Sequence, residues 1–251
     1  MKQGTLVEAL RRSIRDLVNE PGTVAVAYSG GLDSSLIAAL ASETLETKCY
    51  SVVVSGSHDA NTVRTSAEKE GRAVDIIILS DEDLRGLVKT AACLVGLDSP
   101  MAIAYMTPLL GVIARARETV ILAGNGADEL FGGYAKYLDM SDPSLQMLAD
   151  LDKSLREAKA LMEHASAEGK TIGFPFLSDR VRRLALSMPL EKKIRGTSRK
   201  VVLREVAKDL NLSSQDKPKR AAQYSSGVLK RMNVLAKSDG ISLESWIKSL
   251  R

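Results

Sequence analysis

Short runs of apolar, β-branched residues alternate along the chain with longer stretches whose apolar positions recur every three or four residues. Four such runs lie within about the first 135 residues: Thr23–Tyr28, Cys49–Val54, Asp75–Leu79 and Thr119–Ala123. Near-continuous apolar strands separated by helices are typical of a parallel sheet that is covered on both faces. The pattern therefore predicts a doubly wound α/β unit, with a ligand bound beyond the carboxyl ends of the strands.

Helical patterns precede the first strand and dominate the second half of the chain. The stretch Thr5–Asn19 is amphipathic and stops at Pro21-Gly22; its apolar face consists of Leu6, Leu10, Ile14, Leu17 and Val18. After Tyr134 we expect helices only. Because no Gly/Ser-rich linker separates the two parts, we expect an α/β core of residues 1–137 with an all-helical cap, residues 138–251, packed on it.

The composition is that of an ordinary globular protein. Of 251 residues, 45% are hydrophobic and 26% are charged, which argues against collagen-like and disordered classes. No apolar run approaches the ~20 residues of a membrane span, and the N-terminus lacks the apolar segment of a secretory signal. We therefore expect a cytoplasmic protein with no membrane partner. A structural zinc site is not expected, because the two cysteines and two histidines are too far apart in the sequence: Cys49, Cys93, His58 and His164. Both cysteines are expected to be buried.

The net charge of +4 is unevenly distributed. Residues 189–231 hold 12 Lys and Arg against 4 Asp and Glu. Such a segment either attracts an anion, a nucleotide polyphosphate or an RNA backbone, or forms a solvated helix face.

A glycine- and serine-rich loop joins the first strand to a helix. Its sequence is Ser29-Gly30-Gly31-Leu32-Asp33-Ser34-Ser35. Glycines let the backbone approach an anion, and the helix N-terminus offers N–H groups and the positive end of the helix dipole. Asp33 would repel phosphate unless a divalent cation lay between them, which suggests magnesium. The loop thus predicts a phosphate cradle, although its spacing is neither that of a Walker A loop nor G-x-G-x-x-G.

A second glycine-rich segment follows the fourth strand. It reads Ala123-Gly124-Asn125-Gly126-Ala127-Asp128-Glu129-Leu130-Phe131-Gly132-Gly133-Tyr134. Glycines again allow a ligand to approach, and Asp128 would complete a magnesium site with Asp33. Glu129 is either a second metal contact or a charge at the start of a helix, and we favour the latter.

These two motifs resemble those of the N-type ATP pyrophosphatases, the PP-loop superfamily. S-G-G-L-D-S-S is similar to the pyrophosphate-binding loop of that superfamily, which includes the synthetase domains of asparagine, GMP and NAD synthetases. G-N-G-A-D-E-L-F-G-G-Y is similar to the S-G-E-G-A-D-E-L-F-G-G-Y segment of the asparagine synthetase branch. The resemblance implies a Rossmann-like (adenine nucleotide alpha hydrolase-like) fold, the use of ATP and Mg²⁺, and cleavage between the α and β phosphates.

Further matches extend the resemblance from Val24 to Gly227. They are Gly56-Ser57-His58-Asp59, Pro175-Phe176-Leu177, Arg199-Lys200-x-x-Leu203-Arg204 and the block Lys217–Gly227. The resemblance implies that Tyr28, Val52, Ala123 and Gly124 line the adenine and ribose pocket. It also implies that Lys219 contacts pyrophosphate and stabilises the reacting acyl centre.

The chain departs from the family pattern at three places. Asn125 replaces the glutamate that is thought to take a proton from the attacking amine, and an amide cannot act as a general base. Ser178 replaces the aspartate of P-F-L-D, and the arginine before that motif is missing near Gly173, which weakens the case for an aspartate pocket. Lys2 stands where the glutaminase domain of the family has its N-terminal cysteine.

We therefore expect an AMP-forming ligase that adenylates a small carboxylic acid, aspartate being one candidate, before ammonia or an amine attacks. A separate glutaminase subunit is one source of the ammonia. The alternatives are a tRNA-modifying member of the superfamily, which the second motif and the lack of paired cysteines disfavour, and a catalytically silent ATP-binding subunit. Nucleic acid is not the expected partner. Trp246 is expected to serve packing or the contact of a homodimer.

Overall fold

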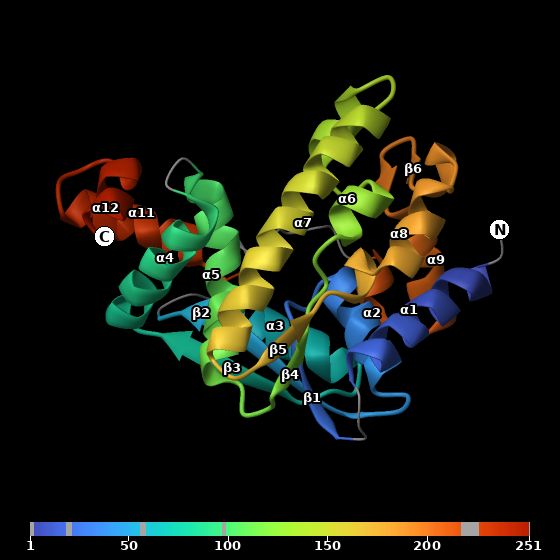
Figure 1. The fold of residues 1–251 in the computed structure, drawn as a ribbon, viewed down its shortest axis with the longest axis horizontal. Coiled ribbons are helices and arrows are strands. Elements are labelled where there is room, and N and C mark those ends of the chain that lie inside the picture. The colour runs from blue at the N-terminus through green and yellow to red at the C-terminus, as the bar shows by residue number, and fades with distance from the viewer. Residues whose placement is uncertain (1–2, 19–21, 56–58, 97–98, 217–225, 251) are drawn as a thin grey trace.

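A five-stranded parallel sheet lies at the centre of the computed structural model, which describes residues 3–18, 22–55, 59–96, 99–216 and 226–250 (Figure 1). The strand order is β3-β2-β1-β4-β5. The strands are β1 (Thr23–Ala27), β2 (Glu46–Val54), β3 (Val74–Leu79), β4 (Val120–Leu122) and β5 (Thr171–Gly173).

The register of the sheet places the ends of its central strands together. Ala27 pairs with Tyr50 at the end of β1, and Val26 of β1 pairs with Leu122 of β4. Val24, Ala25 and Val26 are fully buried because both faces of β1 are covered, which is why its sequence is continuously apolar. The carboxyl ends of β1, β2 and β4 therefore lie at the same edge of the sheet.

Helices cover both faces of the sheet (Figure 1). One group packs on β2, β3 and β5 through α5 and α7, with α4 beside them, and a second group packs on β1 and β2 through α2 and α3, with α1 and α9 against α2. The helices are α1 (Gln3–Leu17), α2 (Leu32–Ala41), α3 (Asp59–Lys69), α4 (Asp81–Val95), α5 (Pro100–Arg115), α6 (Ala127–Phe131), α7 (Ser144–Ala167), α8 (Asp179–Leu186), α9 (Val201–Asp209), α11 (Val228–Ser238) and α12 (Leu243–Ser249).

The predicted fold class is confirmed: a parallel α/β sheet with helices on both faces is followed by a mainly helical region. That region also contains short strands that the sequence pattern did not predict. β5 adds to the main sheet beside β4, and β6 (Ile194–Arg195) pairs with β7 (Ser198–Arg199) in a two-stranded antiparallel sheet. Strands of two or three residues are too short to show a hydrophobic period. The described residues of this half also form short 3₁₀ turns, namely η1 (Ala135–Asp139), η2 (Pro175–Leu177), η3 (Leu190–Lys192) and η4 (Ser213–Asp216).

Trp246 and the two cysteines occupy different environments. The Trp246 ring is fully buried, its Nε1 donates a hydrogen bond to Asp239, and the Arg85 guanidinium lies 5.2 Å from the ring centroid. Trp246 therefore serves packing within the chain. Cys49 is buried, as expected, but the expectation for Cys93 was wrong because the outer face of α4 leaves it exposed.

Within the described ranges, no single helix is both long and apolar enough to cross a membrane. Among these residues, α4 and α5 taken together reach such a length and composition, but the two helices lie at an angle of 118° to one another.

Candidate active site

A cavity of about 910 Å³ opens at the carboxyl ends of β1, β2 and β4. This volume lies within the usual range for small-molecule sites. Twelve of the residues singled out from the sequence as nucleotide, metal or catalytic residues line it: Tyr28, Ser29, Gly30, Gly31, Leu32, Asp33, Ser34, Val52, Ala123, Gly124, Asn125 and Asp128. Ser35 lies behind this surface, where it is fully buried and its hydroxyl is 3.5 Å from that of Tyr28. Lys219 and His58 are outside the described residues.

The loop from Ser29 to Ser34 is closed by its own hydroxyl groups. The Ser34 hydroxyl donates to the Gly31 carbonyl and accepts from the Ser29 N–H, at 3.1 and 3.2 Å. Gly30 has a φ of +71°, and a Cβ there would lie 2.9 Å from the Cβ of Ser66. Because both the conformation and the space require glycine, the loop can keep its backbone at the cavity surface, beside the N-terminus of α2.

Gly124 brings the second motif against the first. A Cβ at Gly124 would lie 3.0 Å from the Cβ of Asp33 and 3.2 Å from the backbone N of Ser34. A side chain at Gly124 would therefore push the segment after β4 and the start of α2 apart by a few tenths of an ångström. This approach places Asp33 and Asp128 on the same cavity.

Lys200 joins these two carboxylates. Its Nζ lies 2.7 and 2.6 Å from the two carboxylate oxygens of Asp33 and 2.6 Å from Oδ1 of Asp128. The Lys200 side chain is only 4% exposed. Burial by itself would lower the pKa of Lys200, but the carboxylates of Asp128 and Asp33 outweigh it, and the net effect is a raised pKa. The ammonium therefore stays charged between its two partners.

The residues around Lys200 place its ammonium between the two carboxylates. Lys200 has a left-handed backbone, φ 57° and ψ 39°, which is uncommon for a side chain other than Gly, Asn or Asp. Arg199 donates a hydrogen bond to the carbonyl of Gly133 at 2.8 Å. A Cβ at Gly133 would overlap Oδ1 of Asp128 and Cε of Lys200. The glycine that ends the second motif thus leaves the space through which Lys200 reaches Asp128.

The same oxygens fit a nucleotide-bound magnesium ion. Mg²⁺ is usually held in proteins by one or two carboxylates, with substrate phosphates and water completing the shell. Asp33 and Asp128 supply two carboxylates that already share one cation, beside a loop suited to phosphate. In the part of the chain that the structure describes, no group of three or more His, Cys, Asp or Glu side chains is placed to bind a metal on its own. The donor set therefore suits a metal that arrives with phosphate.

Glu129 is buried beside this pair. It lies in the first turn of α6, as the sequence suggested, but it is only 8% exposed. Burial, and then the neighbouring Asp128, raise the pKa of Glu129 to about 7. The Tyr134 hydroxyl donates to Oε1 of Glu129 at 2.6 Å, whereas Oε2 has no hydrogen-bond partner among the described residues.

A charged wall of the cavity comes from α5 and α7, and no motif in the sequence predicted it. The Tyr105 hydroxyl donates to Oε2 of Glu157, and burial, then Glu157, raises the pKa of Tyr105 well above its ordinary value. Oε1 of Glu157 has no hydrogen-bond partner among the described residues, and Lys153 lies 3.7 Å from it. Asp150 is engaged by Lys136, at 2.6 Å, and by Tyr137 and Gln146. These residues are far apart in the sequence and belong to no sequence motif. The three-dimensional packing of α5 and α7 brings them together at the cavity.

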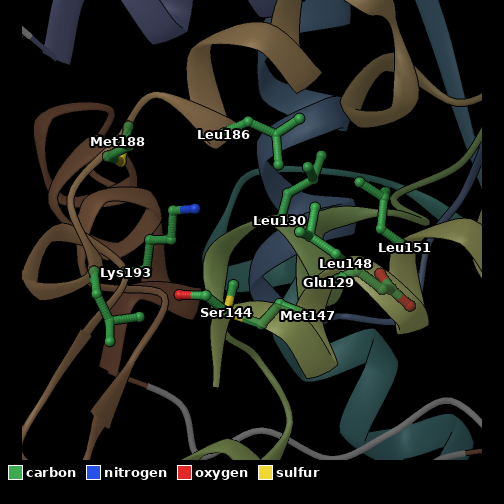
Figure 2. A pocket seen from close by; sticks show the side chains of 10 residues that line it. Glu129, Leu130, Ser144, Met147, Leu148, Leu151, Leu186, Met188 and Lys193 are labelled. Atoms are coloured by element: carbon green, nitrogen blue, oxygen red, sulfur yellow. The ribbon is translucent and has the colours of Figure 1, made fainter. Parts of the chain in front are cut away.

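A second, smaller cavity of about 140 Å³ adjoins the first, and Glu129 lines both (Figure 2). The other lining residues are mostly apolar: Leu130, Ser144, Met147, Leu148, Leu151, Leu186, Met188, Leu190 and Lys193. Figure 2 shows the Lys193 amine pointing into this cavity, toward the leucines on its opposite side. Lys193 is 7% exposed, and burial lowers its pKa. Across the described ranges its amine has no hydrogen bond or ion pair.

Much of the basic segment is engaged by the protein itself. Lys200 and Arg204 line the main cavity, and Lys193 is buried. Arg231 makes a two-point ion pair with Asp81 at 2.7 and 2.6 Å. At these four positions the positive charge is therefore not part of an open basic surface, whereas Lys192, Arg195, Lys208 and Lys230 are exposed, and Lys217, Lys219 and Arg220 lie outside the described residues.

Comparisons with known proteins point to one family. The family model described as asparagine synthase matches residues 5–169 and 151–240. A putative asparagine synthetase [glutamine-hydrolyzing] 1 of Methanocaldococcus jannaschii is 30% identical over 280 residues, covering 94% of this chain and 52% of the relative. Asparagine synthetase [glutamine-hydrolyzing] 1 of Bacillus subtilis is 31% identical over 173 residues, covering 64% of this chain and 27% of the relative. The chain thus spans about half the length of these relatives, or less.

Among solved structures, the U34-tRNA thiolase NcsA from Methanococcus maripaludis with its [4Fe-4S] cluster is similar at a TM-score of 0.40 and 13% identity. The match covers 99% of this chain and 78% of the thiolase.

Proposed function

Because the chain belongs to the asparagine synthase family, we propose that it is an ATP-dependent, AMP-forming ligase that joins a small carboxylic acid to ammonia or an amine. The observation that carries this proposal is the meeting of two glycine-rich loops, one suited to phosphate, at the paired carboxylates Asp33 and Asp128. We also propose that it acts in the cytoplasm.

The nucleotide would occupy the side of the cavity formed by residues 1–137. We assign the adenine and ribose to Tyr28, Val52, Ala123 and Gly124, which line the cavity beyond the strand ends. The phosphates would accept hydrogen bonds from the loop Ser29–Ser34 and the first N–H groups of α2. Mg²⁺, held by Asp33 and Asp128, would neutralise phosphate charge when it is bound.

The first step would form an acyl-adenylate. A carboxylate oxygen of the acid attacks the α-phosphorus of ATP, the bond to the bridging oxygen breaks, and pyrophosphate leaves with that electron pair. The Ser29–Ser34 loop holds the departing pyrophosphate, and Lys200 lies at its edge. Lys219 lies outside the described residues. We retain the proposal that it contacts pyrophosphate and the acyl centre.

The second step needs a proton acceptor that Asn125 cannot provide. The nitrogen attacks the acyl carbon, AMP leaves with the electron pair of the carbon–oxygen bond, and the nitrogen loses a proton. We assign this proton to Glu157, which lines the cavity on α7 and keeps one oxygen without a hydrogen-bond partner in the described part of the chain. Because Tyr105 stays protonated, it continues to donate to the other oxygen and fixes the carboxylate.

The acceptor acid would lie between the nucleotide and the α5–α7 wall, on the side where α7 lines the cavity. Aspartate is the first candidate because the relatives carry the name asparagine synthetase. The nitrogen would enter as free ammonia, as an amine, or from a separate glutaminase subunit. A homodimer also remains a prediction.

Isotope exchange between pyrophosphate and ATP tests the first step. We expect exchange that requires Mg²⁺ and an acid, and that falls at least 100-fold in Asp33→Asn. The matched control is Asp16→Asn, on the exposed end of α1. Exchange at the wild-type rate in Asp33→Asn would show that this carboxylate has no part in handling phosphate.

A steep salt dependence of tRNA binding would favour the tRNA-modifying alternative. The engagement of Lys200, Arg204 and Arg231 within the protein argues against it. ATP binding without AMP formation on any acid would favour the silent subunit.

A further inference from the structure

Lys200 occupies the position at which a divalent cation would be bound. Its Nζ is within 2.7 Å of both Asp33 oxygens and of Oδ1 of Asp128. A magnesium ion would need these oxygens at about 2.0–2.1 Å. The ammonium and the metal therefore exclude one another, and one must leave before the other binds.

Several features of the neighbouring structure hold Lys200 in this position. The left-handed backbone at Lys200 persists only where neighbouring structure holds it. Gly133 leaves the passage open, and the hydrogen bond from Arg199 to the Gly133 carbonyl ties β7 to the end of the second motif. A lysine with no function beyond packing would not need this combination of a strained backbone and a side-chain-free neighbour.

We propose that Lys200 is a built-in competitor for the metal: in the nucleotide-free protein its ammonium holds Asp33 and Asp128, and only a metal that arrives with a nucleotide displaces it. This proposal rests on the proposed function only in taking the two aspartates as metal ligands. A free divalent cation would have to displace the ammonium from three short contacts with carboxylate oxygens. The displaced ammonium would then lose these anionic partners. A metal–nucleotide complex also brings phosphate oxygens to the adjoining Ser29–Ser34 loop, and these give the released ammonium new partners.

The consequence is an order of binding. The wild-type protein would take up the metal together with the nucleotide and would bind the metal alone only weakly. Without the lysine, the two carboxylates would lose the ammonium that they share, and a divalent ion could take its place between them. Removal of Lys200 should therefore tighten binding of the free metal, whereas a merely structural lysine would not affect it in this direction.

Mn²⁺ alone is the probe, and its binding is measured by calorimetry and by the electron paramagnetic resonance of the free ion. We expect Lys200→Met to bind one Mn²⁺ at least ten times more tightly than wild type without nucleotide. Mn²⁺ should also raise the melting temperature of this variant and not that of wild type. The control is Lys193→Met, which removes another buried lysine that has no carboxylate partner among the described residues.

Two further variants keep the result interpretable. Lys200→Gln is the second neutral variant if Lys200→Met fails to fold by circular dichroism. Asp33→Asn combined with Lys200→Met should lose the gained Mn²⁺ site, which would locate it.

Equal Mn²⁺ affinity in wild type and in the folded Lys200 variants would overturn the proposal. So would wild-type affinity for Mn²⁺ alone that matches its affinity in the presence of a non-hydrolysable ATP analogue. Neither result depends on amide formation, so failure of the ligase proposal would be seen separately, as a lack of acid-dependent exchange.

Discussion

The buried carboxyl of Glu129 predicts a pH-dependent loss of stability. It is 8% exposed, and burial beside Asp128 raises its pKa from 4.5 to about 7. A tenfold change in an acid dissociation constant corresponds to about 1.4 kcal/mol, so ionising this group in the folded protein costs about 3 kcal/mol more than in the unfolded chain. That is a large share of the ~5–15 kcal/mol by which domains are usually stable.

The direction follows from which state keeps the proton. Below pH 4.5 both the folded and the unfolded chain hold it, and Glu129 imposes no penalty. Between pH 4.5 and about 7 the unfolded chain loses its proton while the folded protein retains it, so stability falls. Above pH 7 both are ionised and the penalty is constant.

The substitution Glu129→Gln removes this titration and keeps an oxygen to accept the hydrogen bond from Tyr134. We expect the free energy of unfolding of Glu129→Gln, relative to wild type, to rise by about 3 kcal/mol between pH 4.5 and 8. Urea unfolding at constant ionic strength measures it, with the fluorescence of Trp246, the single tryptophan, as the signal.

Glu163→Gln is the matched control, because Glu163 lies on the exposed surface of α7 with its side chain 69% accessible. Its difference from wild type should not change with pH. A flat difference for Glu129→Gln as well would refute the reasoning, because it would mean that the Glu129 carboxyl titrates as it does in water.

Two further substitutions test the cradle and the α5–α7 wall. Gly30→Ala should lower the free energy of unfolding by about 1–3 kcal/mol, because it strains a backbone at φ +71° and crowds Ser66. Gly86→Ala, at an open position in α4, should instead be neutral or stabilising by up to about 1 kcal/mol, and equal effects at both glycines would contradict this explanation. Glu157→Gln should slow amide formation at least tenfold and leave acid-dependent pyrophosphate exchange within twofold of wild type, with Glu163→Gln unchanged in both assays. Parallel losses of exchange and amide formation would show that Glu157 is not confined to the second step.

The sequence predicted the architecture well where its signals were local. Continuous apolar runs predicted β1 to β4 to within a few residues. The central strands β1 and β4 are apolar because both of their faces are covered. The edge strand β3 is apolar as well, although Ile78 is 62% exposed. β5 was missed, because a strand of three residues has no period and owes its place to pairing with β4.

The residues of the candidate site were also predicted where the signal was local in the sequence and missed where it was not. The two loops could be predicted because glycine, serine and aspartate directly after a strand are typical of a site that binds phosphate and a metal. The role of Lys200 was missed although the residue belonged to a matched motif, since nothing in the sequence indicates that its ammonium reaches Asp33, 167 positions away. Tyr105 and Glu157 gave no signal, because only the packing of α5 beside α7 makes them neighbours.

The fate of oxygen-18 from the acid tests the central claim most directly. If a carboxylate is adenylated, incubation with ATP, Mg²⁺, ammonium and aspartate labelled in its side-chain carboxyl should give amide, pyrophosphate and AMP that carries one labelled oxygen on its phosphate. Mass spectrometry of the AMP reads this out, and the same experiment can be repeated with other acids. Unlabelled AMP, or ADP and inorganic phosphate in its place, formed together with the amide would contradict the proposed chemistry.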